Sequence, residues 1–594
     1  MGLASGAVLL AALFAACTDS YRGPVDTTGT GGNPVTTTTT HTVGTGGDGG
    51  LFMDGGGGSC DPACSNDLKS VVDCHGKELE ACTPDQGCSS AKCIDDPCKA
   101  AEESHSSYGC DYYALKTALR LQADGACFAA FVANTWGKAA HLKVDRGGLD
   151  LPTETFAYIP SVQGQQVTYT PYDAVNGLGV GEVAILFLSR LSVGGSVVNC
   201  PMPAAINQET GVTDTGIGMS FHITSDVPVV TYQIVPYGGG QAGVTSATLL
   251  LPTSSWDKNY VAINAYAATP NLSKGYPSLD VVAYKDNTEV TILPKVDILA
   301  GTNVDGAPAG MPKKYTLNKG QFLQITQEQE LTGSPIESSE PVGVFGAATC
   351  VDIPSDQLDC DSAQQQLPPV KALGSEYAAV RYKGRGGGQD ETPPWRVVGT
   401  VDGTTLEWTP AKPPGAPKTL NLGDVVEFKS AGPFVVKSQD ADHPFYLGAY
   451  MTGGEPFNGE GDPDWVNVVP PSQYLTNYVL FTDPTYPETS LVVIRTPSKV
   501  DGKFADVTLG CAGTLGDWQP FGPYEYTRVT LVTGDFQSVG TCSNGRQEMK
   551  SDLPFGVTVW GWGTTQQTKA VSYAYPAGAG FQPINQVVVP TIPK

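Results

Sequence analysis

Charged side chains are scarce in this sequence: Asp, Glu, Lys and Arg make up 16% of its 594 residues. Long solvated helices need many such residues, so their scarcity argues against a helical protein. Basic residues are the rarer kind, 35 against 60 acidic ones, and the formal net charge is −25. A surface this acidic repels phosphate backbones, so we expect no nucleic-acid partner.

Motifs for nucleotide binding, metal-dependent proteolysis and serine hydrolysis are also missing. The sequence contains no G-x4-G-K-[ST], no H-E-x-x-H and no G-x-S-x-G. With only 6 histidines, the nearest approach to a nucleophile pair is Ser220 with His222, two residues apart in a predicted strand. Alternating polar residues on a strand face explain this pair more simply. We therefore predict no catalytic residue, no metal and no cofactor.

Carboxylates leave one enzymatic possibility open, because paired acids can hydrolyse glycans. The most acidic loop covers 457–465 and contains Glu460, Asp462 and Asp464. Oxygen donors at this spacing could bind Ca²⁺. The loop matches no calcium-binding template, and a solvated loop is the favoured interpretation.

The N-terminus has the pattern of an export signal. Residues 1–16 are apolar, end in small residues, and are too few to span a bilayer as a helix. Cys17 follows and resembles the bacterial lipobox, in which this thiol receives a lipid. Two features depart from that pattern: Phe14 stands where Leu is usual, and no basic residue precedes Arg22. Plain secretion and an uncleaved anchor are the alternatives to lipid attachment at Cys17.

Residues 17–59 are rich in Gly and Thr and almost free of large apolar residues. Such a segment cannot bury enough surface to offset the entropy of ordering, so we expect a disordered tether. Together with the signal peptide, it predicts an extracytoplasmic protein. The protein would be held at the outer membrane or cell surface only through its N-terminal lipid.

Of the 15 cysteines, those other than Cys17 are even in number, as a fully paired set requires. About 40 residues, 60–98, form a cysteine-rich module that is too small to fold without crosslinks. Behind an export signal we expect disulfides, and the absence of C-x2-C disfavours zinc. The module's cysteines are Cys60, Cys64, Cys74, Cys82, Cys88, Cys93 and Cys98. Their number is odd, so one must pair outside the module, with Cys110 or Cys127 as candidates.

Two further candidate disulfides lie later in the chain, Cys350–Cys360 and Cys511–Cys542. Each would close a short loop and contribute roughly 2–4 kcal/mol to stability. Both would be structural and not catalytic.

Beyond residue 108 the chain repeats itself at about 110 residues. Four prolines are predicted to open a strand, where no ladder hydrogen bond is lost. They are Pro228, Pro341, Pro444 and Pro554.

A second signature is a Pro eight residues before a Tyr that opens an apolar run. These pairs are Pro252 with Tyr260, Pro369 with Tyr377, and Pro470 with Tyr478. Segments 281–294 and 397–410 are predicted hairpins around Asp286-Asn287 and Asp402-Gly403, and 315–326 resembles 418–429.

These signatures recur in one order, which predicts an all-β protein of four tandem antiparallel units after the cysteine-rich module. The units are 108–240, 249–352, 366–454 and 468–594, the last including a closing segment. They could form a propeller-like ring or a row of β-sandwiches. The late segment 586–590 resembles the linker before a further unit, which slightly favours the ring.

Whole segments of this region resemble the IgGFc-binding protein N-terminal domain family. They are GCDYYALKTALRL at 109–121, CFAAFVANTW at 127–136, YTPYDAVNGLGVGEVAILFLSR at 169–190 and YPSLDVVAYKDNTEVTILP at 276–294. The resemblance covers about 105–590 and includes bacterial lipoproteins with a cysteine-rich lead. It implies a surface or secreted binding role, but a shared fold does not transfer a ligand.

We therefore expect a cell-surface lipoprotein that binds a macromolecule, a glycoprotein or a polysaccharide, in adhesion or recognition. The alternatives are a secreted glycan hydrolase that uses paired carboxylates, and a structural envelope protein. Exposed aromatic residues would favour binding, and Trp560 with Trp562 on one strand face are candidates, although core packing explains most aromatics. A pair of acids in a deep pocket would favour the hydrolase.

Overall fold

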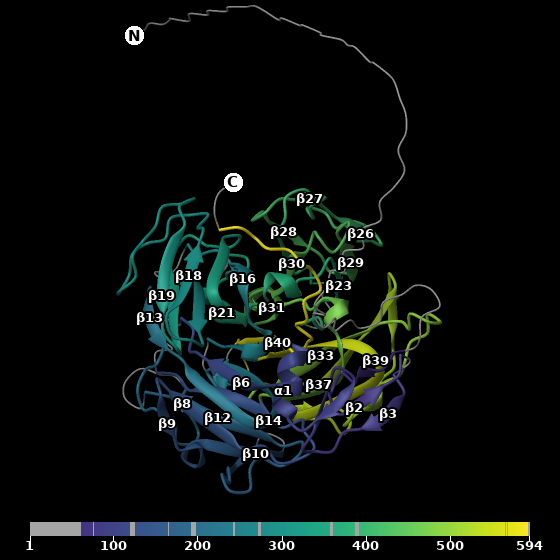
Figure 1. Ribbon diagram of the computed structural model, residues 1–594. Helices are drawn as coiled ribbons and strands as arrows, with labels where there is room; N and C mark the ends of the chain where they lie inside the picture. Colours follow the sequence, from purple (N-terminus) through teal and green to yellow (C-terminus); the bar gives the residue numbers. More distant parts are fainter. Residues whose placement is uncertain are drawn as a thin grey trace, which may run out of the picture. The chain divides into compact units, whose positions relative to one another are not determined.

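The computed structural model describes residues 61–591, apart from 75, 119–124, 164–165, 192–197, 242–243, 271–274, 357–359, 387–390, 565, 567 and 569. The expected signal peptide, Cys17, the tether and Cys60 lie outside these residues. The described chain is mostly β-sheet (Figure 1), which confirms the predicted all-β class. Among its helices, none has the length and the apolar character needed to cross a membrane.

The cysteine-rich module consists of very short strands and one helix. Strands β1, β2 and β3 form one sheet, and β4 pairs with β5. Their bounds are β1 Ala63–Cys64, β2 Ser70–Val72, β3 Glu78–Ala81, β4 Gly87–Ser89 and β5 Lys92–Ile94, followed by α1 Pro97–Ser104. The helix begins where Asp96 accepts a hydrogen bond from the Lys99 N–H and Pro97 occupies the first turn.

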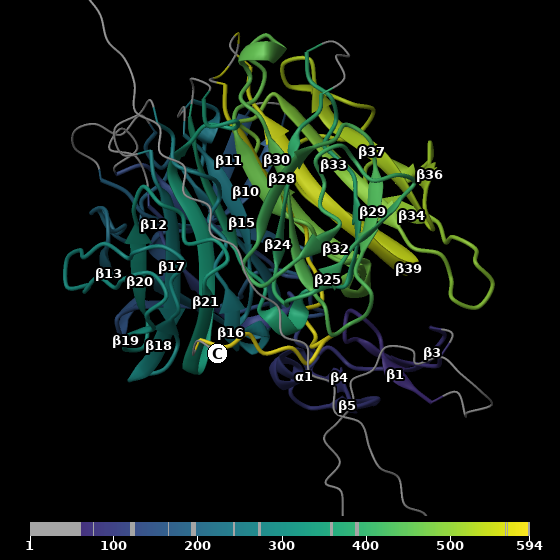
Figure 2. The ribbon, with the colours of Figure 1, turned by 90° about the horizontal axis from the view of Figure 1, so that it is seen from above.

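The module is fixed to the rest of the chain. A disulfide joins Cys98 to Cys110, and the Trp136 indole N–H donates to the Pro84 carbonyl at 2.8 Å. Figure 2 shows α1 and the module strands grouped at one end of the larger sheets. The crosslink outside the module that the odd number of cysteines requires is therefore Cys98–Cys110.

The first large sheet has the order β11-β10-β12-β7-β14-β8-β9, and β6 and β15 also pair with β14. Its strands are β6 Gly109–Ala114, β7 Phe128–Ala133, β8 Leu142–Arg146, β9 Leu149–Leu151, β10 Ala157–Gln163, β11 Gln166–Pro171, β12 Val183–Ser189, β14 Phe221–Val235 and β15 Ser246–Leu250.

The second sheet has the order β13-β20-β17-β21-β18-β19, and β16 and β22 also pair with β21. Its strands are β13 Gly216–Met219, β16 Asp257–Val261, β17 Pro277–Ala283, β18 Thr288–Ile292, β19 Lys313–Leu317, β20 Gln321–Thr326, β21 Pro335–Val351 and β22 Asp361–Gln366.

The third stretch of chain divides into the sheets β23-β29-β26, β28-β24-β30-β31 and β25-β27. Its strands are β23 Glu376–Ala379, β24 Pro394–Gly399, β25 Thr404–Thr405, β26 Glu407–Thr409, β27 Thr419–Leu420, β28 Val425–Lys429, β29 Phe434–Lys437, β30 Phe445–Met451 and β31 Asp464–Asn467.

The fourth sheet has the order β35-β34-β39-β33-β37-β36, with β32 and β40 on β39 and β38 on β37. Its strands are β32 Leu475–Thr482, β33 Glu488–Arg495, β34 Val507–Leu509, β35 Gly513–Thr514, β36 Gln519–Phe521, β37 Tyr524–Thr533, β38 Gln537–Ser538, β39 Gly545–Trp562 and β40 Ser572–Pro576.

The predicted strand-opening role of the repeat prolines is wrong for three of the four. Pro228, Pro341 and Pro554 lie inside the long strands β14, β21 and β39, and only Pro444 immediately precedes a strand. Each long strand pairs with one set of neighbours before its proline and with another set after it; β39, for example, pairs with β34 up to Ser551 and with β33 from Phe555. The proline therefore stands at the crossing between two half-sheets, where no ladder hydrogen bond is needed.

The predicted hairpins are also wrong, although their turns are present. Asn287 and Gly403 have the positive φ expected of turn residues. The strands on either side do not pair with each other: β17 pairs with β20 and β21, whereas β18 pairs with β19 and a different part of β21. The chain thus changes half-sheet at the turn, and alternating hydrophobicity alone does not distinguish this from a hairpin.

The first strand of each of the four stretches of chain (β6, β16, β23 and β32) carries a tyrosine that is hydrogen-bonded next to a proline of the first signature. These prolines are Pro228, Pro341, Pro444 and Pro554. The side-chain O–H donates to the carbonyl of the residue that follows the proline in all four stretches. The bonds are Tyr112 to Val229 (2.7 Å), Tyr260 to Val342 (2.8 Å), Tyr377 to Phe445 (2.6 Å) and Tyr478 to Phe555 (2.5 Å). All four tyrosines are buried.

The same tyrosine oxygens accept a second hydrogen bond from the backbone three residues earlier. Asp257 N–H donates to Tyr260 at 3.1 Å, Gly374 N–H to Tyr377 at 3.0 Å, and Leu475 N–H to Tyr478 at 3.0 Å. Short 3₁₀ helices precede these strands: η4 Thr253–Ser255, η5 Val370–Ala372 and η7 Pro471–Gln473. They begin directly after the prolines of the second signature, Pro252, Pro369 and Pro470. The second sequence signature thus encodes a turn, a strand entry and a buried crosslink.

Four short strands at the ends of the sheets meet at one centre. β15 contacts β22 and β40, and β31 contacts the same two strands, so the contacts close in a cycle. In Figure 1 the sheets follow one another around β31 and β40 in the order of the sequence colours. This closed order favours the ring over the row of sandwiches.

The segment 577–591 runs across the strand entries. Phe581 N–H donates to the His105 carbonyl, and Gly580 N–H donates to that of Gln473. Farther along, Ile584 N–H donates to the Lys371 carbonyl and Val589 N–H to the Asn259 side chain. These bonds reach each of the four stretches in turn.

The tyrosine crosslink gives a direct test of stability. Replacing Tyr377 with Phe should lower the free energy of unfolding by about 1–3 kcal/mol, because the Phe445 carbonyl and the Gly374 N–H lose their buried partner. Thermal and denaturant unfolding measure the change. Tyr276→Phe is the matched control, since Tyr276 is only partly buried, and it should change stability by less than about 0.5 kcal/mol. Equal effects of the two substitutions would contradict this role.

Candidate functional site

Four loops join β14, β21, β30 and β39 to the central strands β15, β22, β31 and β40 and come together at one end of the sheets. They span 236–245, 352–360, 452–463 and 563–571, and their described residues are called the loop face below. Gly453 N–H donates to the Ile353 carbonyl at 3.1 Å, and Gly461 N–H donates to that of Gly563 at 2.8 Å. Backbone hydrogen bonds therefore join the loop 452–463 to the loops 352–360 and 563–571.

Asp361 lies beneath the loop face and connects three stretches of chain. Its carboxylate accepts hydrogen bonds from the Thr245 N–H and from the Ser572 N–H, the latter at 3.2 Å. The Ser362 N–H donates to the same carboxylate at 3.0 Å, and the Thr245 hydroxyl also donates, at 3.3 Å. One side chain thus satisfies donors from the first, second and fourth stretches.

Asp464 is a second buried acid at this centre. The Trp465 N–H donates to it at 2.7 Å, and the Ser246 hydroxyl lies 3.4 Å from it. Burial raises the pKa of Asp361 and of Asp464 well above their usual range, and Asp361 raises that of Asp464 further. Both acids therefore lie in surroundings that disfavour the charged carboxylate.

Gln365 lies among the four central strands. Its amide nitrogen lies 3.1 Å from the Ala247 carbonyl and 3.0 Å from the carbonyls of Trp465 and Ala574. These carbonyls belong to the three other central strands. A single side chain therefore connects all four central strands.

Two cavities beside the central strands are small. Two cavities among the described residues have volumes of about 20 and 30 Å³, and neither is lined by Asp361 or Asp464. Ligand pockets typically measure about 300 Å³ or more, so these cavities admit a water molecule but no sugar. The acid pair is thus placed to hold the central strands together.

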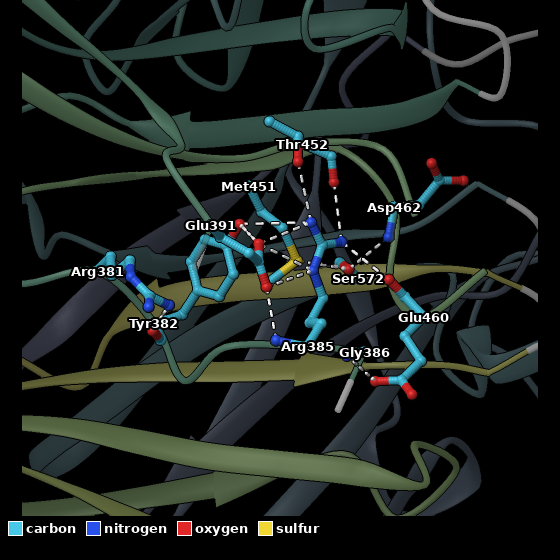
Figure 3. A network of polar contacts seen from close by, with 10 residues as sticks. All are labelled: Arg381, Tyr382, Arg385, Gly386, Glu391, Met451, Thr452, Glu460, Asp462 and Ser572. Carbon is cyan, nitrogen blue, oxygen red and sulfur yellow. Dashed lines mark hydrogen bonds and ion pairs between the residues drawn. The ribbon is translucent and has the colours of Figure 1, made fainter. Parts of the chain in front are cut away.

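A buried Arg–Glu pair supports the loop face from the third stretch (Figure 3). The Arg385 guanidinium lies 3.1 Å from the Glu391 carboxylate, and both side chains are almost completely buried. Arg385 also donates to the carbonyls of Thr452 and Glu460, each at 2.9 Å. The Tyr382 hydroxyl donates to Glu391 at 2.5 Å.

This pair is well satisfied for a buried charge. Burial lowers the pKa of Arg385, but Tyr382 and Glu391 outweigh it and raise this pKa above its usual value. The guanidinium also lies 4.5 Å from the centre of the Phe457 ring. The buried Arg385–Glu391 ion pair thus holds the loop 452–463 in place through the carbonyls of Thr452 and Glu460.

His222 and Ser220 do not form a nucleophile pair. The Ser220 hydroxyl donates to the Gly320 carbonyl at 2.7 Å, whereas His222 lies between Asp145 (2.7 Å) and Asp111 (3.2 Å). Burial lowers the pKa of His222, but the two carboxylates outweigh it and raise this pKa above its usual value. His222 therefore faces two carboxylates and not the Ser220 hydroxyl.

The acidic loop 457–465 is not the solvated loop that its composition favoured. Asp462 and Asp464 are buried, and the Asp462 N–H donates to the Ser572 hydroxyl at 2.9 Å. Glu460 accepts a hydrogen bond from the Gly386 N–H at 3.1 Å. The described residues hold no cluster of three or more metal-ligating side chains. The loop is anchored because backbone donors from neighbouring loops, invisible in the sequence, face its acids.

The candidate aromatic patch is part of the core. Trp560 and Trp562 are each 1% exposed, and no aromatic residue is among the large exposed apolar side chains of the described chain. Core packing, the simpler alternative, explains both tryptophans. Among the described residues, the aromatic side chains are therefore buried or partly buried.

The described cysteines are disulfide-bonded. The structure pairs Cys350 with Cys360 and Cys511 with Cys542. In and near the module it pairs Cys64 with Cys88 and Cys82 with Cys93, and Cys127 pairs with Cys200. Cys74 is also disulfide-bonded.

Sequence reasoning missed Arg385, Glu391 and Asp361. No motif marks them: Arg385 and Glu391 pair with each other, and Asp361 accepts hydrogen bonds from backbone groups distant in sequence. One usable signal was present: Arg385 and Glu391 are charged residues flanking a glycine-rich segment in a chain that is poor in charge.

Two comparisons with known proteins agree with the resemblance. A family model described as IgGFc binding protein matches residues 246–561. The human IgGFc-binding protein is 25% identical over 236 residues, which is 38% of this chain and 4% of the human protein. The chain thus matches only a small part of that relative's length.

Removing the buried cation should weaken the loop face. Arg385→Ala should destabilise the protein by about 3–5 kcal/mol, because it leaves the Glu391 carboxylate buried without a partner charge. Arg385→Ala together with Glu391→Ala should recover part of this loss. Thermal unfolding measures both. A single variant as stable as the parent chain would show that the pair does not support the loops.

Proposed function

Since the chain belongs to the IgGFc-binding protein family, we propose that it binds an extracellular protein ligand, such as a glycoprotein, through its loop face. The observation that carries this proposal is that the loop 452–463 is hydrogen-bonded to the loops 352–360 and 563–571, and that Thr245, at the end of the loop 236–245, is hydrogen-bonded to the buried Asp361. Loops held by a rigid scaffold are common sites of recognition. Such loops lose little entropy on binding, which favours affinity.

The chemistry of the loop face supports a basic partner surface. Asp356 and Glu455 are exposed on neighbouring loops, and the chain carries a net charge of −25. Opposite charges accelerate encounter and orient the partner. A protein ligand with Lys and Arg at its contact surface fits this face better than an acidic one.

A protein ligand is favoured over a polysaccharide by what the described surface exposes. Sugar-binding surfaces commonly use exposed aromatic rings, and here the large aromatic residues are buried or partly buried. The human relative is named for IgG Fc, which makes an Fc fragment the first ligand to test.

Under the same proposal, the rest of the chain would present the loop face at the cell surface. Residues 1–16 would be the signal peptide, Cys17 the lipid attachment site, 17–59 the tether and 60–98 the cysteine-rich module. The four β units 108–240, 249–352, 366–454 and 468–594 would form one ring. The tether would hold the ring away from the membrane, with adhesion or recognition as its role.

A glycan hydrolase is the second candidate function. The buried pair Asp361 and Asp464 is the observation that favours it, since paired carboxylates can act on glycosidic bonds. A substrate would need an opening that neither of the two described cavities provides. Release of reducing sugar, lost in Asp361→Asn, would establish this function in place of ours. Failure of both tests would leave the structural envelope role.

Charge reversal on the loop face tests the binding proposal. The double variant Asp356→Lys/Glu455→Lys should weaken binding of a basic protein ligand at least about tenfold, because it places like charges across the contact. Surface plasmon resonance with an IgG Fc fragment, a mucin-type glycoprotein and dextran as probes measures the change.

The matched control is Asp150→Lys/Glu154→Lys. These two acids are exposed near β9, at the other end of the first sheet. The control changes net charge equally and should leave affinity unchanged within about twofold. If both double variants weaken binding equally, the loop face is not the site.

Lipid attachment has a separate test. Cys17→Ser should release the protein into the medium, because it removes the thiol that would carry the lipid. Fractionation and metabolic labelling with a fatty acid measure release and loss of label. Continued membrane retention of the Cys17→Ser chain would overturn the anchor but leave the binding proposal intact.

A further inference from the structure

Strand β11 is an open edge of the first sheet. It ends the order β11-β10-β12-β7, and no other described strand pairs with its outer side. Gln166, Thr168 and Thr170 are exposed, whereas Val167 and Tyr169 are partly buried. The strand thus presents a row of polar side chains to solvent and a free backbone edge.

The hydrogen-bond pattern shows which backbone groups are free. Tyr172 N–H donates to the Ala157 carbonyl at 2.9 Å, which fixes the bonded positions of the antiparallel pair. Bonded and non-bonded positions alternate along such a pair. Thr168 and Thr170 therefore bond to β10, and the N–H and C=O groups of Val167 and Tyr169 point outward.

This edge lacks the protection that other outer strands of the same protein carry. Charged residues on an edge strand normally prevent pairing between molecules. β3 carries Glu78 and Glu80, β19 carries Lys313 and Lys314, and β28 carries Glu427 and Lys429. β13 is four residues long and is bridged at Gly216 by Thr302. By contrast, β11 has six residues and lies within an uncharged stretch, 155–172.

We propose that β11 pairs with β11 of a second copy of this chain, antiparallel and related by a two-fold axis at Thr168. In this register Val167 faces Tyr169 of the partner, and each exchanges its outward N–H and C=O with the other. The two-fold axis repeats the exchange, which gives four backbone hydrogen bonds. The two Thr168 residues face each other at a non-bonded position, where Cα atoms lie about 4.5 Å apart.

The edge fits a second copy for two reasons. Its free groups are self-complementary, because the outward positions lie symmetrically on either side of Thr168. Each copy carries a charge of −25, so copies repel, and an uncharged strand is where they can approach most closely. Pro171 has no N–H and ends the pairing, so the contact is small and the dimer is expected to be weak.

Sedimentation equilibrium of the full chain carrying Cys17→Ser, over about 1 μM to 1 mM, tests the dimer. The chain should show a reversible monomer–dimer equilibrium. Thr168→Lys should raise the dimer dissociation constant at least about tenfold, since it places two lysines opposite each other at the axis. Val167→Pro, which removes an outward N–H without adding charge, should act in the same direction.

Ser161→Lys is the matched control. Ser161 is the exposed β10 partner of Thr168, one strand farther from the axis. It adds the same charge to the same face and should leave the dissociation constant unchanged within about twofold. The proposal fails if the chain is monomeric throughout, if both lysine variants weaken the dimer equally, or if Val167→Pro leaves it unchanged. A monomer whose Fc-fragment binding is lost in Thr168→Lys would instead assign this edge to the ligand.

Discussion

One hydrogen bond, repeated four times, underlies the architecture. A buried tyrosine at the start of each stretch donates to the carbonyl that follows the repeat proline. The proline lies where the chain leaves one half-sheet for the other, so the strand there has free backbone groups and no neighbour to satisfy them. The tyrosine satisfies the carbonyl and packs its ring at the crossing. Without it, a buried acceptor would remain unpaired, which costs about 1–3 kcal/mol at each site.

The loop face depends on this arrangement. Each crossing fixes the direction in which a long strand runs, and thereby the place where its loop returns to the central strand. The four central strands then meet, with Gln365 and Asp361 satisfying donors and acceptors from the other stretches. Arg385 and Glu391 hold one loop from beneath. The buried polar groups thus fix the positions of the loops.

The sequence alone predicted the all-β class. It also singled out the four prolines at the crossings and three of the four tyrosines, Tyr260, Tyr377 and Tyr478, because these depend on local signals; Tyr112 was missed. Pairing was harder to predict. The turns at Asn287 and Gly403 are real, yet the strands beside them belong to different half-sheets, and alternation of apolar residues is the same in both cases. Asp462, Asp464 and Trp560 were misjudged or left open for the same reason: their burial is decided by neighbouring loops and strands distant in sequence.

Hydrogen exchange of the chain with and without a bound protein ligand, followed by mass spectrometry, tests whether the ligand binds to the loop face. An IgG Fc fragment is the first ligand to use. We predict slower exchange on binding in peptides from 236–245, 352–360, 452–463 and 563–571, with little change along β18 and β19. Protection confined to the outer strands or to the cysteine-rich module, with these loops unchanged, would contradict it.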